Sequence, residues 1–127
     1  MPGPAKLFLA IGAIAMLAAV ALGAFGAHAL KAQIAPDVLA VYRTGVEYHF
    51  YHAIGLLIVG LAAQRLPDSN WLRAAGWLML AGIVIFSGSL YLLAVTGVRA
   101  FGAVTPVGGV AFMLAWVTFG IAVVKSR

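Results

Sequence analysis

Two of the three histidines lie beside two tyrosines at the start of one apolar segment, GVEYHFYHAIGLL, residues 45–57. His49 and His52 are three residues apart, so on a helix they share a face with Tyr48 and Gly45. Imidazole and phenol groups can hydrogen-bond to each other, bind a metal ion or pass a proton. The residue types therefore leave several kinds of chemistry open.

The third histidine, His28, ends the preceding apolar run at a similar depth. Three imidazoles are a ligand set for a copper- or zinc-like ion, and a pair on facing helices could ligate a haem. No further signature supports either site, so we predict no bound cofactor and keep His28, His49 and His52 as metal candidates only. Alternatively, these side chains hydrogen-bond among themselves, or line a polar path for a substrate or proton.

Glu47 lies about 160° around the helix from His49, at 100° per residue. Arg43 is one turn earlier, so an Arg43–Glu47 pair at the membrane surface is the plainer expectation. The chain has three acidic residues in all and no evident serine–histidine–acid spacing. The sequence therefore favours a non-enzymatic protein.

The composition indicates a membrane protein. Of the 127 residues, 65% are hydrophobic and 9% are charged, whereas a soluble domain is about 25% charged. A membrane-spanning helix needs about 20 apolar residues, so the chain has room for four spans and short loops. We expect an all-α, four-helix transmembrane bundle that forms a single integral membrane domain, residues 1–127.

The net charge of +5 does not indicate nucleic-acid binding. The basic residues are scattered at the ends of the apolar runs, where they can reach lipid headgroups and orient the helices. The expected partners are the lipid bilayer and either a second copy of the chain or another membrane protein. The absence of cysteine excludes disulfides and thiolate metal sites.

The four expected spans cover about 7–30, 45–64, 71–96 and 104–124. The first begins like a signal peptide, but it exceeds the 7–15 apolar residues typical of such segments, so we expect an uncleaved helix. Pro36 and Asp37 suit a first helical turn. They predict a short interfacial helix before the second span, either continuous with that span or bent near Gly45.

Thr105 and Pro106 predict the start of the fourth helix, with threonine as the N-cap and proline at the first position. Four spans place both termini on one side of the membrane. Five basic residues then lie on the terminal side and three on the other side. The positive-inside rule predicts that both termini are cytoplasmic.

The unusual motifs of all four spans fall in the half of the membrane that lies away from the termini. They are GAFGAHAL, EYHFYH, FSGSLY and TPVGG. A helix start with small residues, as in TPVGG, is a possible headgroup or anion site. The candidate ligand- or partner-binding residues in this half are His28, Tyr48, His49, His52, Ser87, Ser89, Tyr91, Thr105 and Gly108.

Small residues repeat every four positions in the first span, at Ala15, Ala19, Gly23 and Ala27. Such stripes allow close approach of helices in lipid. We expect this stripe to pack against a neighbouring helix, within one chain or between two copies.

Taken together, GAFGAHAL, the pair Tyr48 and His52, FSGSLYLLAVTG and TPVGG followed by a tryptophan resemble the domain-of-unknown-function 423 family. Its members are small bacterial inner-membrane proteins, with a similar protein in eukaryotes. The resemblance implies a four-helix protein of the bacterial inner membrane and no established activity. Our leading hypothesis is a non-enzymatic module that binds a lipid, a quinone-like molecule or a membrane protein. The alternative is a small transporter or ion path that uses the histidines and tyrosines.

Overall fold

The computed structural model describes all 127 residues and contains helices but no strand. Four helices or stacks of helices are long and apolar enough to cross a membrane, so the all-α prediction is confirmed. In chain order the elements are α1 (Gly3–His28), the short 3-10 turn η1 (Leu30–Ala32), α2 (Pro36–Ala63), α3 (Asn70–Gly82), the π-helical segment η2 (Ile83–Ser87), α4 (Gly88–Thr96) and α5 (Ala100–Val124).

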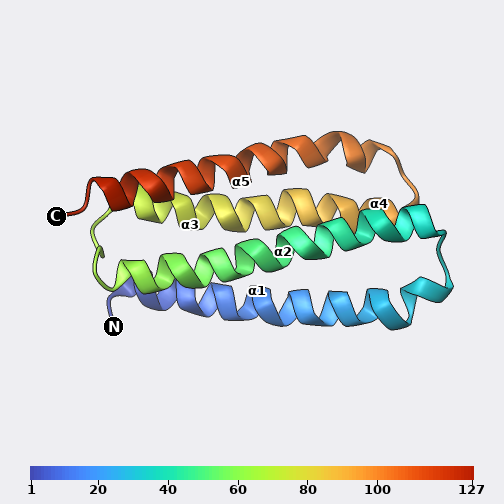
Figure 1. Ribbon diagram of the computed structural model, residues 1–127, viewed down its shortest axis with the longest axis horizontal. Coiled ribbons are helices and arrows are strands. Elements are labelled where there is room, and N and C mark those ends of the chain that lie inside the picture. The colour runs from blue at the N-terminus through green and yellow to red at the C-terminus, as the bar shows by residue number, and fades with distance from the viewer.

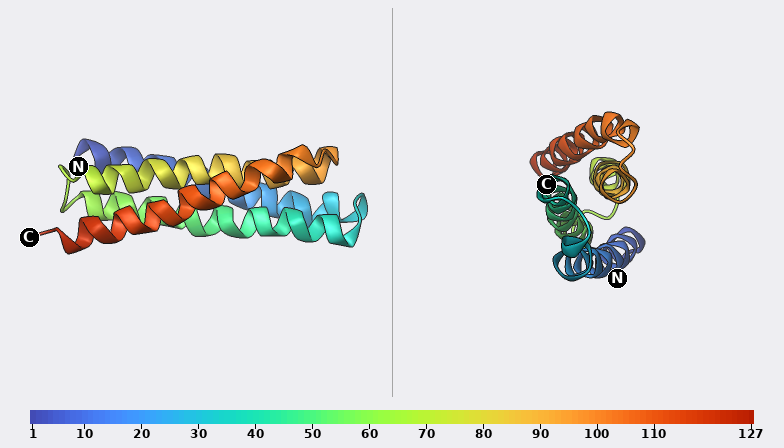
Figure 2. Two further views of the ribbon diagram at one scale, coloured as in Figure 1. Left: turned by 90° about the horizontal axis from the view of Figure 1, so that it is seen from above. Right: turned by 90° about the vertical axis from the view of Figure 1, so that its right-hand side faces the viewer.

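The spans run up and down, so both termini lie at the same end of the molecule (Figure 1). α3, η2 and α4 follow one another as a single span. α1 packs mainly on α2, and α5 packs mainly on the α3–η2–α4 span. Figure 2 shows α1 and α5 at the two outer sides, with α2 and the third span between them. α2 and the third span therefore each pack against more than one neighbouring span, and a site built from several spans would be formed around them.

Two predicted helix starts shift in the structure. Residues 36–44 are the first turns of α2, so the interfacial segment is continuous with the second span and is not a separate helix. α5 begins at Ala100, and Pro106 lies inside it. Gly97 explains the earlier start, because its φ of 71° ends α4 in a left-handed turn that reverses the chain within a few residues.

The small-residue stripe of α1 packs on α2 as far as Gly23, where a Cβ atom would lie 3.4 Å from Val46, but not at Ala27. Ala15 and Ala19 are buried, whereas Ala27 is exposed and Gly26 is buried in its place. A repeat of four residues turns by about 40° per step on a helix of 3.6 residues per turn. The stripe therefore rotates away from α2, and the residue eleven after Ala15 returns to the contact.

A buried cluster of apolar side chains links all four spans, with Phe8, Leu56, Leu72, Met79 and Phe112 among its largest members. Many large apolar side chains of the outer helices remain exposed, including Ile14 and Leu17 of α1 and Met113 of α5. Such a surface matches the hydrocarbon of a bilayer, as expected for membrane-spanning helices.

Candidate functional site

Ser87 joins the two central spans. Its side chain is fully buried, and its hydroxyl donates a hydrogen bond of 2.7 Å to the carbonyl oxygen of Gly45 in α2. Ser87 is the last residue of η2, where the helix widens for five residues. Segments of this kind change the rotation of the residues that follow them and occur often at functional sites.

Ser89 and Thr105 join α4 to α5. Their hydroxyl oxygens lie 2.5 Å apart, and the Ser89 hydroxyl also donates to the carbonyl oxygen of Phe86 at 2.8 Å. The Thr105 hydroxyl likewise has a backbone acceptor, the carbonyl oxygen of Phe101 at 3.4 Å. Each hydroxyl carries one proton, so either side chain can be the donor in the bond between them. Thr105 therefore bonds across the bundle and does not cap the start of α5.

Gly108 is buried where α5 crosses η2. A Cβ atom at this position would lie 2.7 Å from the Cα atom of Phe86. The glycine thus allows the two backbones to touch. This backbone contact fixes the position along α5 at which the Phe86 side chain lies between α2 and α5.

His49 is buried between α1, α2 and the third span. Its Nδ1 atom lies 2.8 Å from the hydroxyl oxygen of Tyr91, and the backbone of Ala15 faces the same ring. A Cβ atom at Gly45 would lie 3.0 Å from the Tyr91 ring, so this tyrosine also packs closely on α2. His49 and Tyr91 therefore connect α2 with α4.

His52 is held on both ring nitrogens. Its Nδ1–H donates to the carbonyl oxygen of Tyr48 at 2.7 Å, and its Nε2 accepts a hydrogen bond of 3.0 Å from the indole N–H of Trp116. Phe112 stacks on the imidazole at a ring distance of 3.5 Å and an angle of 11°. Since a carbonyl only accepts and an indole only donates, this pattern fixes a neutral imidazole in one tautomer.

The neighbours of His52 line a groove of about 390 Å³ between α2, η2 and α5. We call it the aromatic groove. It is lined by Tyr48, His52, Phe86, Gly109, Phe112, Met113 and Trp116. The Tyr48 ring contacts the Phe86 ring at 4.8 Å, and its hydroxyl makes no hydrogen bond within the chain. Tyr48 therefore lines the groove with a hydroxyl that no other group of the chain occupies.

The three histidines do not form one cluster. His28 is exposed at the end of α1, while His49 and His52 are buried and bond to different helices. No group of three histidine, cysteine, aspartate or glutamate side chains could hold a metal ion. The two alternatives that bring His28, His49 and His52 together, as metal ligands or as hydrogen-bond partners of one another, are therefore wrong. Matching depth in the membrane does not bring side chains to the same side of a helix.

Sequence reasoning missed the partners of His52, which lie on α5. Gly108, Phe112 and Trp116 are spaced by four residues and thus follow one helical face. That spacing was a usable signal, but it is equally typical of ordinary packing. Glu47 also has a different partner from the one expected, since it accepts a short hydrogen bond from the Tyr51 hydroxyl.

The family described as protein of unknown function (DUF423) matches residues 22–109. The chain is 52% identical to the UPF0382 membrane protein YwdK of Bacillus subtilis over 120 residues, which cover 94% of this chain and 98% of the relative. It is 44% identical to the UPF0382 membrane protein SERP0230 of Staphylococcus epidermidis over 121 residues, 94% of this chain and 97% of the relative. No solved structure matches the chain.

Proposed function

Because the chain belongs to the DUF423 family of membrane proteins, whose function is unknown, we propose a role from the groove itself. The protein is a non-enzymatic module of the bacterial inner membrane that binds a quinone-like molecule in the aromatic groove. The free hydroxyl of Tyr48 beside the aromatic wall is the observation that carries this proposal. A quinone offers both a flat ring and a carbonyl oxygen, which match these two features.

The size and lining of the groove support a small apolar ligand. Its volume of about 390 Å³ lies within the range of about 300–1,000 Å³ for ligand pockets. Phe86 and Phe112 offer ring faces or edges, on which a flat ring packs favourably. Met113 and Trp116 at the rim are 63% and 41% exposed. A ligand could therefore enter from the side, out of the lipid.

The hydrogen bonds of the same region favour binding over catalysis or ion conduction. His52 uses both ring nitrogens, and Ser87 and Ser89 bond to neighbouring backbone or side chains. A general base or a proton relay needs a nitrogen or oxygen that is free to exchange a proton. Tyr48 is the group in the groove whose polar atom remains available to a ligand.

Quenching of tryptophan fluorescence by decylubiquinone tests the proposal. Replacing the exposed Trp71 and Trp77 with phenylalanine leaves Trp116 as the single reporter beside the groove. Saturable quenching is expected at quinone concentrations where free tryptophan in the same detergent is barely affected. Tyr48→Phe keeps the ring but removes the donor. It should weaken binding by roughly fivefold, since a hydrogen bond contributes about 1 kcal/mol.

A matched pair of variants on α5 separates binding from general quenching. Gly109→Leu places a side chain in the groove, whereas a Cβ atom at Gly120 meets no atom within 4 Å. Gly109→Leu should abolish saturable quenching and Gly120→Leu should retain it. Equal quenching in both variants would overturn the proposal. Competition by an alkyl chain without a ring would assign the groove to lipid instead.

The orientation of the protein in the membrane is part of the proposal. Both termini lie at one end (Figure 1), together with five of the eight basic residues. The positive-inside rule then supports cytoplasmic termini. Tyr48 and His52 flank the middle of α2 and Phe112 is the middle residue of α5, so the aromatic groove would lie near the centre of the membrane.

A further inference from the structure

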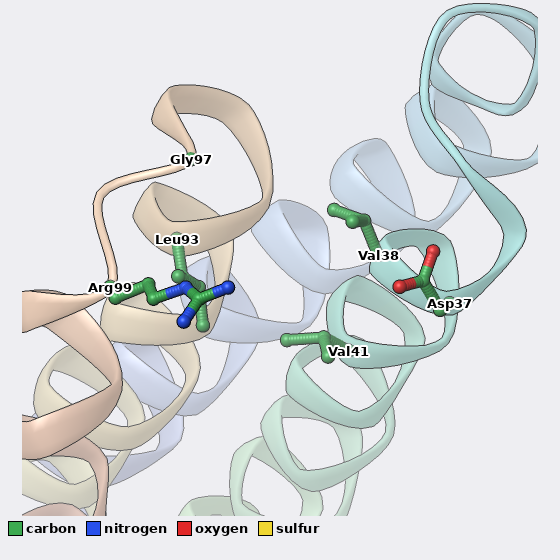
Figure 3. Close-up of a pocket in the computed structure, with 6 residues that line it drawn as sticks. All are labelled: Asp37, Val38, Val41, Leu93, Gly97 and Arg99. Atoms are coloured by element: carbon green, nitrogen blue, oxygen red, sulfur yellow. The ribbon is translucent and has the colours of Figure 1, made fainter.

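A second pocket lies at the end of the molecule away from the termini. Figure 3 shows it between the start of α2 and the turn from α4 to α5. Its volume is about 310 Å³. We call it the interfacial pocket. Its lining residues are Asp37, Val38, Val41, Leu93, Gly97 and Arg99.

The two charged residues come from different spans and lie on opposite sides of this pocket. Asp37 is in the first turn of α2, and Arg99 is the N-cap residue of α5. In Figure 3 the guanidinium group of Arg99 overlaps Leu93 and points toward Val41, with the carboxylate of Asp37 on the far side. The left-handed turn at Gly97 holds Arg99 in this position, because it ends α4 just before the reversal.

The charge around Arg99 is suited to an anion. Its guanidinium lies at the N-terminus of α5, where the helix dipole contributes further positive potential. The first turn of α5 contains no acidic residue and has no side-chain cap. A phosphate group would complement both the arginine and the helix end, and arginine binds phosphate oxygens with paired donors.

The charge around Asp37 is suited to a cation. Its carboxylate is exposed and accepts hydrogen bonds only, so a primary ammonium group would match it. Between the two charges, Val38, Val41 and Leu93 supply an apolar surface that continues toward the membrane-spanning part. A ligand that fits all three parts has an anionic group, a cationic group and an apolar stem.

We propose that the interfacial pocket binds a phospholipid whose headgroup carries a phosphate and a primary ammonium, as in phosphatidylethanolamine. The phosphate contacts Arg99, the ammonium contacts Asp37, and the glycerol end lies on Val41 and Leu93. α4 ends and α5 begins at this level, so the pocket lies at the depth of lipid headgroups. This site is separate from the aromatic groove and does not depend on it.

Native mass spectrometry of the delipidated full chain tests the assignment with three lipids of identical acyl chains. Dioleoyl phosphatidylethanolamine should bind roughly tenfold tighter than dioleoyl phosphatidylcholine, whose quaternary ammonium cannot donate a hydrogen bond. It should also bind more tightly than dioleoyl phosphatidylglycerol, which has no cation for Asp37. The size of the preference reflects one charge-assisted hydrogen bond.

Three exposed residues provide the variants. Arg99→Gln should weaken all three lipids by roughly tenfold, since it removes a charged donor to the phosphate. Asp37→Asn should reduce the affinity for phosphatidylethanolamine to the level of phosphatidylcholine and leave phosphatidylglycerol no weaker. Arg43→Gln is the control, because Arg43 is an exposed cation on the same helix that does not line the pocket.

Circular dichroism checks that each variant keeps its helices. Equal affinity for the three lipids would overturn the proposal. So would an unchanged phosphatidylethanolamine preference in Asp37→Asn, or an equal loss in Arg43→Gln and Arg99→Gln. Loss of phosphatidylglycerol and phosphatidylethanolamine binding together in Arg99→Gln, with the preference lost in Asp37→Asn, would establish both contacts.

Discussion

The indole N–H of Trp116 donates a hydrogen bond of 3.0 Å to Nε2 of His52, and this contact ties α5 to α2 across the aromatic groove. The other nitrogen of His52 is fixed by the carbonyl oxygen of Tyr48 within the same helix. The imidazole therefore has one orientation and one tautomer. A ring held in this way can serve as a rigid wall on which Phe112 stacks.

Replacing Trp116 with phenylalanine should destabilise the protein, because it removes the indole N–H that donates to His52. The variant keeps an aromatic ring but leaves Nε2 of the buried His52 without its donor, which costs about 1–3 kcal/mol. Thermal unfolding in detergent should therefore show a lower melting temperature. Trp77→Phe is the matched control, because Trp77 is 50% exposed and contacts Phe8 through its ring. Similar losses in both variants would mean that the hydrogen bond contributes nothing specific.

The adjacent glycines of α5 should respond differently to a methyl group. A Cβ atom at Gly108 would lie 2.7 Å from the Cα atom of Phe86, whereas one at Gly109 would lie 3.8 Å from the Phe86 ring. Gly108→Ala should cost about 1–3 kcal/mol, as expected when extra volume is forced into a packed site. Gly109→Ala should be neutral or slightly stabilising, because alanine favours helices over glycine. Unfolding of the two variants in parallel measures the difference; equal stability would contradict close backbone contact at η2.

The contact between α1 and α2 provides a second glycine pair. A Cβ atom at Gly26 would lie 2.9 Å from Cδ1 of Tyr42, whereas one at Gly23 would lie 3.4 Å from Cγ1 of Val46. Gly26→Ala should displace the Tyr42 ring and break its hydrogen bond of 2.5 Å to the carbonyl oxygen of Leu22. The expected loss is about 1–3 kcal/mol, measured by chemical unfolding, against little change in Gly23→Ala. The reverse order would show that the stripe expected from the sequence, and not the observed seam, forms the contact.

The sequence was sufficient to predict the number of spans and the similar depth of several polar residues on neighbouring spans. Both follow from the position of residues along a helix, because each residue adds about 1.5 Å of depth. Ser87, His49 and Tyr91 accordingly lie near one another, as their positions indicated. Depth did not reveal which of these side chains would bond directly to one another.

The rotation of each helix was harder to predict. His28 is thirteen residues after Ala15, about 220° around α1. With Ala15 packed on α2, His28 therefore faces away, and the three histidines cannot meet. The π-helical segment η2 changes the rotation of α4 relative to α3 in a way that periodicity does not reveal. The pairing of Trp116 with His52 depends on the rotation of α5 relative to α2.

The direction of the chain in the membrane gives the last prediction. With both termini at one end, the terminal side carries Lys6, Arg65, Arg73, Lys125 and Arg127, against Lys31, Arg43 and Arg99 on the other side. We expect cytoplasmic termini, because basic residues near the spans are retained on that side. An alkaline phosphatase that is active only in the periplasm, fused after Arg127, should show low activity, and a fluorescent protein that matures only in the cytoplasm should be bright there.

Removing charge from the terminal side provides the causal test of that orientation. Replacing Lys6, Lys125 and Arg127 with glutamine leaves two basic residues on the terminal side against three on the other. If the asymmetry sets the direction, a substantial share of the fusion protein should invert, and phosphatase activity should rise. Replacing Lys31, Arg43 and Arg99 instead should keep the activity low, since that change strengthens the original bias. High phosphatase activity in the unaltered chain would place the termini outside and move the interfacial pocket to the cytoplasmic side.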